Sequence, residues 1–444
     1  MNSISKNSTI TFSSQILNFI LALISSIILA RVLGPKGKGI YALIVLIPKT
    51  MLKLGTLGIE AANVYFTGSK KYKVKDIVSN SLLCSILFGF ILILLFYVIS
   101  QHSVFKNFLN SNQLNSFYVW LMIFTVPFSL LSGYLRNVFL GKEDIITYNK
   151  INILQNALQL AAVFTLLLIL RLDLFGAIST YIFTNICMFL LVVFFIVKNG
   201  IKIYFTYNAK LFKNMLNYGI KAYFANLAQF LNYRLDMFLI AIFLTPVEVG
   251  YYSIAVGIAE KLWMLPGAIA TVLFPRISSI MDIKANNLTS KIARNTFFII
   301  FIFALLLAGI TKPLIKVLFG FAFLSSAMPL LILLPGIVAL SLSKILTADL
   351  AGRGKPQFAA YSSFVSLAVN IPLNLLLIPK WGISGAAFAS TIAYIIATLI
   401  VFISFTKVSG KPWIEVLFIR KEDFQDYKRI ILKIRDGIKK PVST

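Results

Sequence analysis

"ARVLGPKGKGIY" (30–41) and "AIFLTPVEVGYY" (241–252) share the template A-x2-L-x-P-x3-G-x-Y within one chain of 444 residues. The pattern predicts a hairpin that joins two helices in each half of the chain. We expect Pro35 and Pro246 to end one helix and Gly39 and Gly250 to admit the next.

Two weaker echoes keep a similar offset and the same order. "GKEDIITY" (141–148) matches "GKPQFAAY" (354–361), and Gly176-Ala177 matches Gly385-Ala386. An internal repeat of this length predicts two structural halves. Because the offset holds an even number of predicted spans, the halves keep one orientation and are related by an axis along the membrane normal.

The composition is that of an integral membrane protein. Hydrophobic residues make up 59% of the chain and charged residues only 13%, whereas soluble domains are about half apolar and a quarter charged. Runs of about 20 apolar residues predict membrane-spanning helices. The expected spans are 10–30, 39–63, 79–100, 117–139, 150–170, 175–197, 214–244, 249–275, 293–311, 327–348, 358–379 and 384–406. The first is a retained helix, since no small-residue cleavage site follows it.

The predicted fold is therefore all-α, with about 12 transmembrane helices in two six-helix lobes related by a pseudo-two-fold axis. The division of the chain has four parts. They are an N-terminal lobe (1–200), a cytoplasmic linker (201–213), a C-terminal lobe (214–406) and a basic amphipathic cytoplasmic tail (407–444). Such a tail is expected to lie on the anionic lipids of the membrane surface.

Charge sets the expected orientation. The formal net charge is +27, and most of the lysines and arginines fall in alternate loops and in the tail. The positive-inside rule places these segments and both termini in the cytoplasm. Nucleic acid is not needed to explain the charge.

One predicted helix carries a polar stripe. At 100° per residue Lys49, Lys53 and Glu60 fall on one side of the second span. Ionisable groups inside a membrane are costly and usually face a wet interior. The stripe therefore predicts a water-filled cavity.

The repeat offset carries this stripe into the second half. It pairs Lys49 with Glu260, Asn18 with Gln229, and Ser25 with Asp236, so the first, second, seventh and eighth spans are expected to line one cavity between the lobes. Basic residues exceed acidic ones there. The expected substrate-binding residues on these spans suit an anion such as a diphosphate; they are Lys49, Lys53, Arg234 and Lys261.

Other roles for these residues stay open. Arg234 and Asp236 lie about 200° apart on their helix and so do not pair with each other. In one alternative, either residue forms an ion pair with another part of the protein and stabilises the fold. In a second alternative, the Lys261 side chain extends to the membrane surface. Pro266 and Gly267 are the expected hinge.

No enzyme chemistry is indicated. His102 is the only histidine, and Cys84 and Cys187 lie in apolar runs without metal-ligand spacing. The sequence shows no phosphate-binding loop and no external loop with catalytic acids. We expect no catalytic residue, metal or cofactor. Energy is expected from an ion gradient, from the membrane potential or from the gradient of the substrate itself. If H+ or Na+ is coupled, the candidate polar groups are Asn18, Glu60, Gln229, Asp236 and Glu260.

Two stretches resemble a known family. "RLDMFLIAIFLTPVEVGYYSIAVGIAEKLWMLPGAIATVLFPRIS" (234–278) and "SSQILNFILALISSIILARVLGPKGKGIYAL" (13–43) are similar to the polysaccharide and O-antigen flippases of the multidrug/oligosaccharidyl-lipid/polysaccharide exporter superfamily. The resemblance implies a bacterial inner-membrane protein that moves a polyprenyl-diphosphate-linked oligosaccharide outward by alternating access, for O-antigen, capsule or exopolysaccharide assembly. Polysaccharide polymerase and chain-length proteins are the implied partners.

In such flippases basic cavity residues hold the diphosphate or acidic sugars, and the matching positions are Arg31, Lys53, Arg234 and Lys261. Peptidoglycan-precursor flippases carry two further helices, which makes that substrate less favoured here. A cation-coupled small-molecule exporter of the same superfamily is the main alternative. A membrane-embedded glycan polymerase or ligase is the second alternative. Such an enzyme needs a catalytic external loop, and this sequence shows none.

Overall fold

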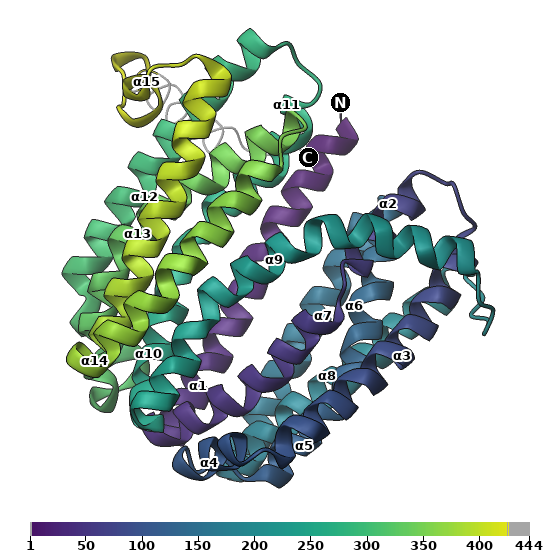
Figure 1. The fold of residues 1–444 in the computed structure, drawn as a ribbon, viewed down its shortest axis with the longest axis vertical. Coiled ribbons are helices and arrows are strands. Elements are labelled where there is room, and N and C mark those ends of the chain that lie inside the picture. The colour runs from purple at the N-terminus through teal and green to yellow at the C-terminus, as the bar shows by residue number, and fades with distance from the viewer. Residues whose placement is uncertain (1, 424, 426–444) are drawn as a thin grey trace, which may run out of the picture.

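The computed structural model describes residues 2–423 and 425, and the described chain is a bundle of helices (Figure 1). The first half holds α1 (Asn2–Gly55), α2 (Ile59–Gly68), α3 (Val74–Gln101), α4 (Ser103–Ser111), α5 (Ser116–Ile123), α6 (Val126–Gly141), α7 (Ile145–Val163), the π-helical η1 (Phe164–Ile169) and α8 (Asp173–Lys198). The second half holds α9 (Ala209–Phe243), α10 (Pro246–Ala259), the 3₁₀-helical η2 (Glu260–Trp263), α11 (Met264–Ile277), α12 (Asp282–Phe319), the 3₁₀-helical η3 (Phe321–Ser326), α13 (Ala327–Gly352), α14 (Gln357–Ser409) and α15 (Trp413–Leu417).

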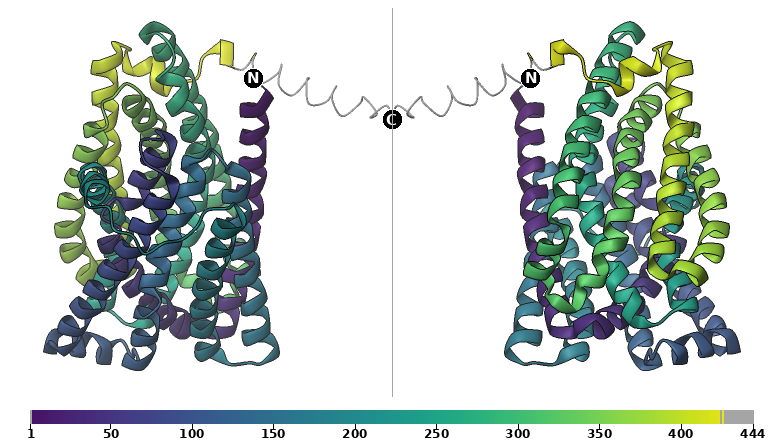
Figure 2. Two further views of the ribbon diagram at one scale, coloured as in Figure 1. Left: turned by 90° about the vertical axis from the view of Figure 1, so that its right-hand side faces the viewer. Right: turned by 90° about the vertical axis from the view of Figure 1, so that its left-hand side faces the viewer.

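The predicted all-α membrane fold is confirmed. Nine helical stretches of the described residues are long and apolar enough to cross a membrane. α1 and α14 are each broken by a glycine with non-helical backbone, Gly34 (φ 64°) and Gly382 (φ 58°), so each contains two consecutive helices. α9 has the length of a span but is more polar. All twelve predicted spans are accommodated in this order, and the long helices run along a common direction (Figure 2).

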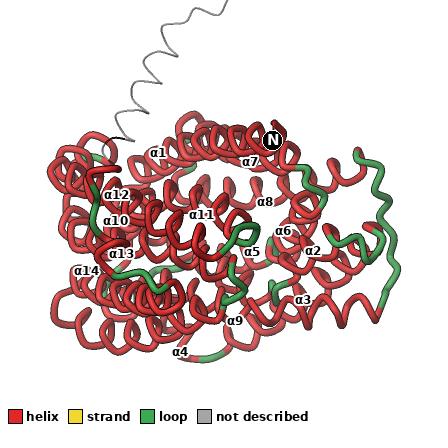
Figure 3. The backbone as a smooth tube through the Cα atoms, turned by 90° about the horizontal axis from the view of Figure 1, so that it is seen from above, coloured by secondary structure: helices red, strands yellow, loops and turns green. Residues whose placement is uncertain are grey.

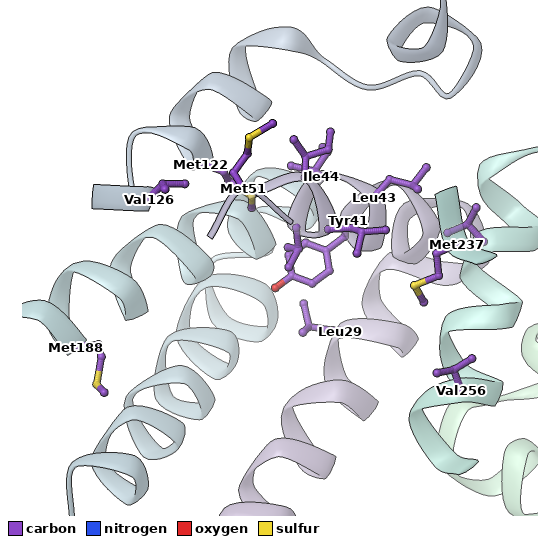
Figure 4. Packing of buried hydrophobic residues seen from close by; sticks show 14 of the residues in the cluster. Leu29, Tyr41, Leu43, Ile44, Met51, Met122, Val126, Met188, Met237 and Val256 are labelled. Atoms are coloured by element: carbon purple, nitrogen blue, oxygen red, sulfur yellow. The ribbon is translucent and has the colours of Figure 1, made fainter. Parts of the chain in front are cut away.

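Two groups of helices are visible along that direction (Figure 3). α2, α3, α6 and α8 lie in one group, and α10, α12, α13 and α14 in the other. The groups diverge toward the end where α1 begins and α15 lies, and they meet near the opposite end, beside α4 (Figure 1). The hydrophobic core is continuous across the meeting point, since Tyr41 and Leu43 of α1 belong to one buried cluster with Met122 of α5 and Met237 of α9 (Figure 4).

α9 crosses between the two groups. Near its start Asn208 exchanges hydrogen bonds with Asn80 of α3, at 2.9 and 3.0 Å. Farther along, the amide of Asn232 donates to Ser366 of α14 and accepts from Asn370, both at 2.8 Å. Buried amide pairs of this kind fix the rotation of a helix within a membrane protein.

The repeated template forms the contact between the lobes. A methyl group placed on Gly39 of α1 would overlap the carbonyl of Pro246, and one placed on Gly250 of α10 would overlap the carbonyl of Pro35. The two contacts are equivalent under the repeat, as a pseudo-two-fold axis requires. Only glycine allows two helix backbones to approach this closely.

The expected role of the prolines and glycines in this hairpin is wrong in detail. Pro246 is the first residue of α10, where Thr245 and Glu248 form a capping box, and Pro35 follows the break at Gly34. The N–H groups in the first turn of a helix have no acceptor within that helix, so proline, which lacks an N–H, is well tolerated there. The prolines therefore begin the second helix of each hairpin, and Gly39 and Gly250 lie within helices.

The beginning of the predicted tail is docked on α12. Asp423 is buried and accepts hydrogen bonds from Arg294 at 2.6 and 2.8 Å, from Asn295 at 3.1 Å and from the backbone N–H of Arg420 at 3.0 Å. Burial opposes ionisation, but these donors outweigh it and lower the pKa of Asp423 to about 2. The predicted amphipathic helix beyond 425 lies outside the described residues.

Gly39→Ala is expected to lower the free energy of unfolding by about 1–3 kcal/mol, because the added methyl group pushes the lobes apart. Gly257→Ala in α10 is the control, since a methyl group there meets no atom within 4 Å. Thermal unfolding in detergent measures both. Equal midpoints for the two variants would contradict the close contact.

Asp423→Asn is expected to release the segment around α15 and to speed tryptic cleavage after Lys411 or Arg420. The neighbouring exposed Glu422→Gln is the matched control. Because the folded pKa of Asp423 lies below the unfolded value of about 3.9, the ion pair contributes fully above pH 4 and is lost as the pH falls from about 4 to 2. Cleavage rates that do not differ between the two variants would count against the docking.

Candidate functional site

A pocket of about 420 Å³ lies between the end of the second helical segment of α1, the start of α2 and the middle of α9. Its lining combines two charged groups, two amides and three aromatic rings with smaller residues. The residues are Lys53, Thr56, Gly58, Glu60, Ala61, Tyr223, Asn226, Leu227, Gln229, Phe230 and Tyr233. Both halves of the chain therefore contribute to one site.

A break in the helix shapes one wall of this pocket. α1 ends at Gly55, and α2 follows Gly58, which has a left-handed backbone (φ 74°). The carbonyls at the end of α1 are capped by tyrosines, with Tyr134 donating to Gly55 at 2.9 Å and Tyr223 donating to Leu54 at 2.8 Å. Satisfied carbonyls allow an interrupted helix to persist inside a membrane protein.

α9 approaches the break at a second glycine pair. Gly58 and Gly219 lie so close that a methyl group on either would overlap the backbone of the other. This contact holds the middle of α9 beside the break. It fixes the width of the pocket.

A charged cluster lies on the C-terminal side of the site. Arg234 of α9 forms a two-pronged ion pair with Glu260, with N–O distances of 2.7 and 3.0 Å. Glu260 begins η2, the short 3₁₀ segment that precedes α11. Pro266 has no N–H to donate to the carbonyl of Leu262, so the α-helix is interrupted here. The expected hinge at Pro266 and Gly267 thus lies next to a real helical break, and its motion stays a prediction.

Lysines surround this ion pair. Lys49 is solvent-exposed and close enough to interact electrostatically with Arg234 and Glu260. Lys261 and Lys344 are also within electrostatic range of Glu260. The Lys261 ammonium lies 5.4 Å from the ring centre of Phe19, and that of Lys344 lies 5.0 Å from the ring centre of Trp263.

The cluster has surplus positive charge. Arg234 neutralises Glu260, and no ion pair with an acid is formed by Lys49, Lys261 or Lys344 in the described part of the chain. Three lysines share the field of one carboxylate that Arg234 already neutralises, so an anion placed among them would supply the missing negative charge. The arrangement is therefore suited to bind a multiply charged anion.

The structure brings most of the predicted site residues together. Gln229, Lys53 and Glu60 line the pocket, and the remaining members lie in the charged cluster: Lys49, Arg234, Glu260 and Lys261. The repeat offset paired Lys49 with Glu260, and these two residues interact near the axis. Their role in binding stays a prediction.

Three predicted residues lie elsewhere. Arg31 is at the end where the lobes meet and donates hydrogen bonds to the carbonyls of Val317 and Leu318 in the last turn of α12. Asn18 of α1 accepts a hydrogen bond of 2.8 Å from Asn156 of α7. Their roles in substrate binding and ion coupling stay predictions.

Asp236 also faces away from the pocket. It is 1% exposed and accepts hydrogen bonds from Tyr252 at 2.6 Å and Ser390 at 3.2 Å. Arg234 and Asp236 do not pair with each other, as the helical spacing indicated. The C-terminal lobe therefore contains a carboxyl group held by neutral donors.

Sequence reasoning missed the aromatic lining and one of the two amides, Asn226. Tyr233 packs with Trp263 and Tyr394, with ring centres 5.0 and 5.7 Å apart. Asn226 and Phe230 line the pocket beside it. Aromatic and amide residues are frequent in any membrane protein of this composition, so the sequence does not show which of them line a pocket. The position of α9 in the fold shows it. Over the described residues no group of three or more His, Cys, Asp or Glu side chains is placed to hold a metal ion.

Fold and site define a two-lobed, multi-pass membrane protein with the fold of known transporters. A solved structure of the lipid II flippase MurJ, inward closed, matches with a TM-score of 0.72 and 18% identity over 91% of this chain and 90% of that one. An inward-facing multidrug resistance MATE family transporter of the MOP superfamily matches with a TM-score of 0.72 and 13% identity, over 88% and 94% of the two chains. Identities this low establish the fold alone.

The family model described as "polysaccharide biosynthesis protein" matches residues 4–281, and the chain belongs to this family. A putative O-antigen transporter of Shigella flexneri is 23% identical over 422 residues, covering 91% of this chain and 98% of that protein. A probable low-salt glycan biosynthesis flippase of Haloferax volcanii is 25% identical over 199 residues, 42% of this chain and only 41% of its own length. The resemblance to polysaccharide flippases is confirmed, and at the family level the chain is a flippase-like transporter.

Arg234→Gln is expected to destabilise the protein, because Glu260 loses its partner. Adding Glu260→Gln should restore part of the loss. The coupling energy should be about 1 kcal/mol, since both side chains are partly exposed, 29% and 23%. Thermal unfolding of the four proteins of the double-mutant cycle gives this value, and strictly additive effects would show that the pair does not contribute.

Proposed function

We propose that this protein is a flippase that translocates a polyprenyl-diphosphate-linked oligosaccharide across the bacterial inner membrane, for surface polysaccharide assembly. The observation that carries the proposal is the unneutralised group of lysines beside the inter-lobe pocket. Lys49, Lys261 and Lys344 surround an ion pair that is already balanced. A diphosphate supplies the negative charge that this group lacks.

The pocket next to these lysines suits the sugar part of such a cargo. Tyr223 and Phe230 offer aromatic surface, and Asn226 and Gln229 offer amide donors and acceptors. Sugars present both apolar C–H faces and hydroxyl groups, so a mixed lining of this kind is complementary to them. The lipid tail would remain in the bilayer.

Alternating access supplies the mechanism. The lobes touch through Gly39 and Gly250 and diverge toward the end that carries the start of α1 (Figure 1). The positive-inside rule assigns the diverging end to the cytoplasm. Cargo would enter there and leave when the contact at the opposite end opens. Polysaccharide polymerase and chain-length proteins would receive it.

We further propose that a gradient of H+ or Na+ drives the cycle. Glu60 lines the pocket and forms no ion pair with any described residue. An unpaired carboxylate in a wet cavity attracts a cation. The same observation supports the alternative, a cation-coupled small-molecule exporter, so the two functions need a direct test.

The test deletes the gene for this protein in its native host and compares surface polysaccharide before and after wild-type or variant protein is restored. Lys49→Gln combined with Lys53→Gln is expected to lower surface glycan at least tenfold at normal protein abundance, with lipid-linked oligosaccharide accumulating on the cytoplasmic leaflet. Lys312→Gln combined with Lys316→Gln, at the opposite end of the molecule, is the control. Full glycan in the Lys49/Lys53 double variant would overturn the diphosphate role. Unchanged glycan on deletion, together with increased drug sensitivity, would establish the exporter.

A further inference from the structure

Lys38 is a buried lysine without an acidic partner. It lies in the second helical segment of α1 and is 9% exposed. Its ammonium lies 5.5 Å from the ring centre of Tyr41, and no ion pair in the described part of the chain includes it. A ring offers a cation much less than a carboxylate does. The burial of this charge is therefore not explained by local structure.

Lys38 shares a helix face with the lysines of the site. It precedes Lys49 by eleven residues, which at 100° per residue is a rotation of about 20°. Lys53 lies another 40° or so around the helix. Lys38 and Lys49 also repel each other electrostatically. One stripe of α1 thus carries three cations and no compensating acid.

The stripe passes through the closed contact between the lobes. Lys53 and Lys49 are solvent-exposed on the side of the pocket. Val45 follows on the same stripe and is 7% exposed, and beyond it Lys38 is next to Gly39, whose backbone lies against α10. The stripe is thus exposed at Lys49 and Lys53 and buried at Val45 and Lys38, and Lys38 lies beside the contact between the lobes.

We propose that Lys38 is a second anion-binding residue, which takes over the diphosphate when the contact at Gly39 and Gly250 opens. The inference rests on the proposed flippase function. In the conformation described here the closed contact keeps Lys38 from the cargo. Opening that end exposes Lys38 on the helix face that carries Lys49, about 16 Å farther along the axis, so the anion can pass from one cation to the other along this face.

Lys36 provides a matched control. It lies two residues from Lys38 on the same helix, carries the same charge and is exposed. Lys38→Gln is expected to lower surface glycan at least tenfold, whereas Lys36→Gln leaves it unchanged. Lys38→Arg should restore most of the glycan, because the guanidinium also binds diphosphate. Immunoblots of membranes control for abundance.

A second measurement covers the case in which Lys38→Gln fails to fold. In a background with Cys84→Ala and Cys187→Ala, Lys38→Cys is labelled from outside the cell with a membrane-impermeant maleimide. Labelling is expected only while the strain supplies cargo and the protein cycles. The Lys36→Cys thiol should label in either case.

The outcomes separate the two proposals. If wild-type protein restores glycan but Lys38→Gln matches Lys36→Gln, or if the Lys38→Cys thiol never labels, the role of Lys38 is wrong and the flippase function stands. If wild-type protein restores no glycan, the flippase function itself fails. Loss of glycan in Lys38→Gln with rescue by Lys38→Arg supports the transfer along α1.

Discussion

Two equivalent contacts hold the lobes together, Gly39 against the carbonyl of Pro246 and Gly250 against the carbonyl of Pro35. Neither position tolerates a side chain, so the second segment of α1 and the start of α10 cross at backbone distance. Beyond this crossing the two helices separate, and the exposed Lys49 and Gly257 mark where space begins. A second close contact, Gly58 of the first half against Gly219 of α9, positions the pocket.

The site combines a neutral sugar-like lining with an unbalanced cationic cluster. Both depend on interrupted helices. The break after Gly55 turns Glu60 toward the pocket, and the 3₁₀ segment before Pro266 turns Glu260 toward Arg234. The two interruptions differ in kind, because the first contains a left-handed Gly58 and the second is a 3₁₀ segment. A helix that changes hydrogen-bonding pattern can also absorb movement between the lobes.

Some of the site residues could be located from the sequence, and others could not. Repeat offset and helical period brought Lys49, Lys53, Glu60, Arg234 and Glu260 to one region, because a charge in a membrane helix has few stable environments. The resemblance to flippases added Arg31 to this group, but Arg31 lies at the end where the lobes meet. A side chain at a helix end can point to the other lobe, and Arg31 reaches the free carbonyls of α12. The helical period gives the face on which a residue lies and does not predict contacts of this kind.

By itself the sequence determined the membrane class, the spans, the two repeats and the excess of intramembrane cations. Apolar length, loop charge and a repeated phrase are local signals, and a bilayer leaves few ways to satisfy them. Only the tertiary structure decided that Arg234 pairs with Glu260, that Asp236 turns to Tyr252, and that Lys38 is buried. Those facts depend on how far two helices approach each other, which is set by atoms distant in the chain.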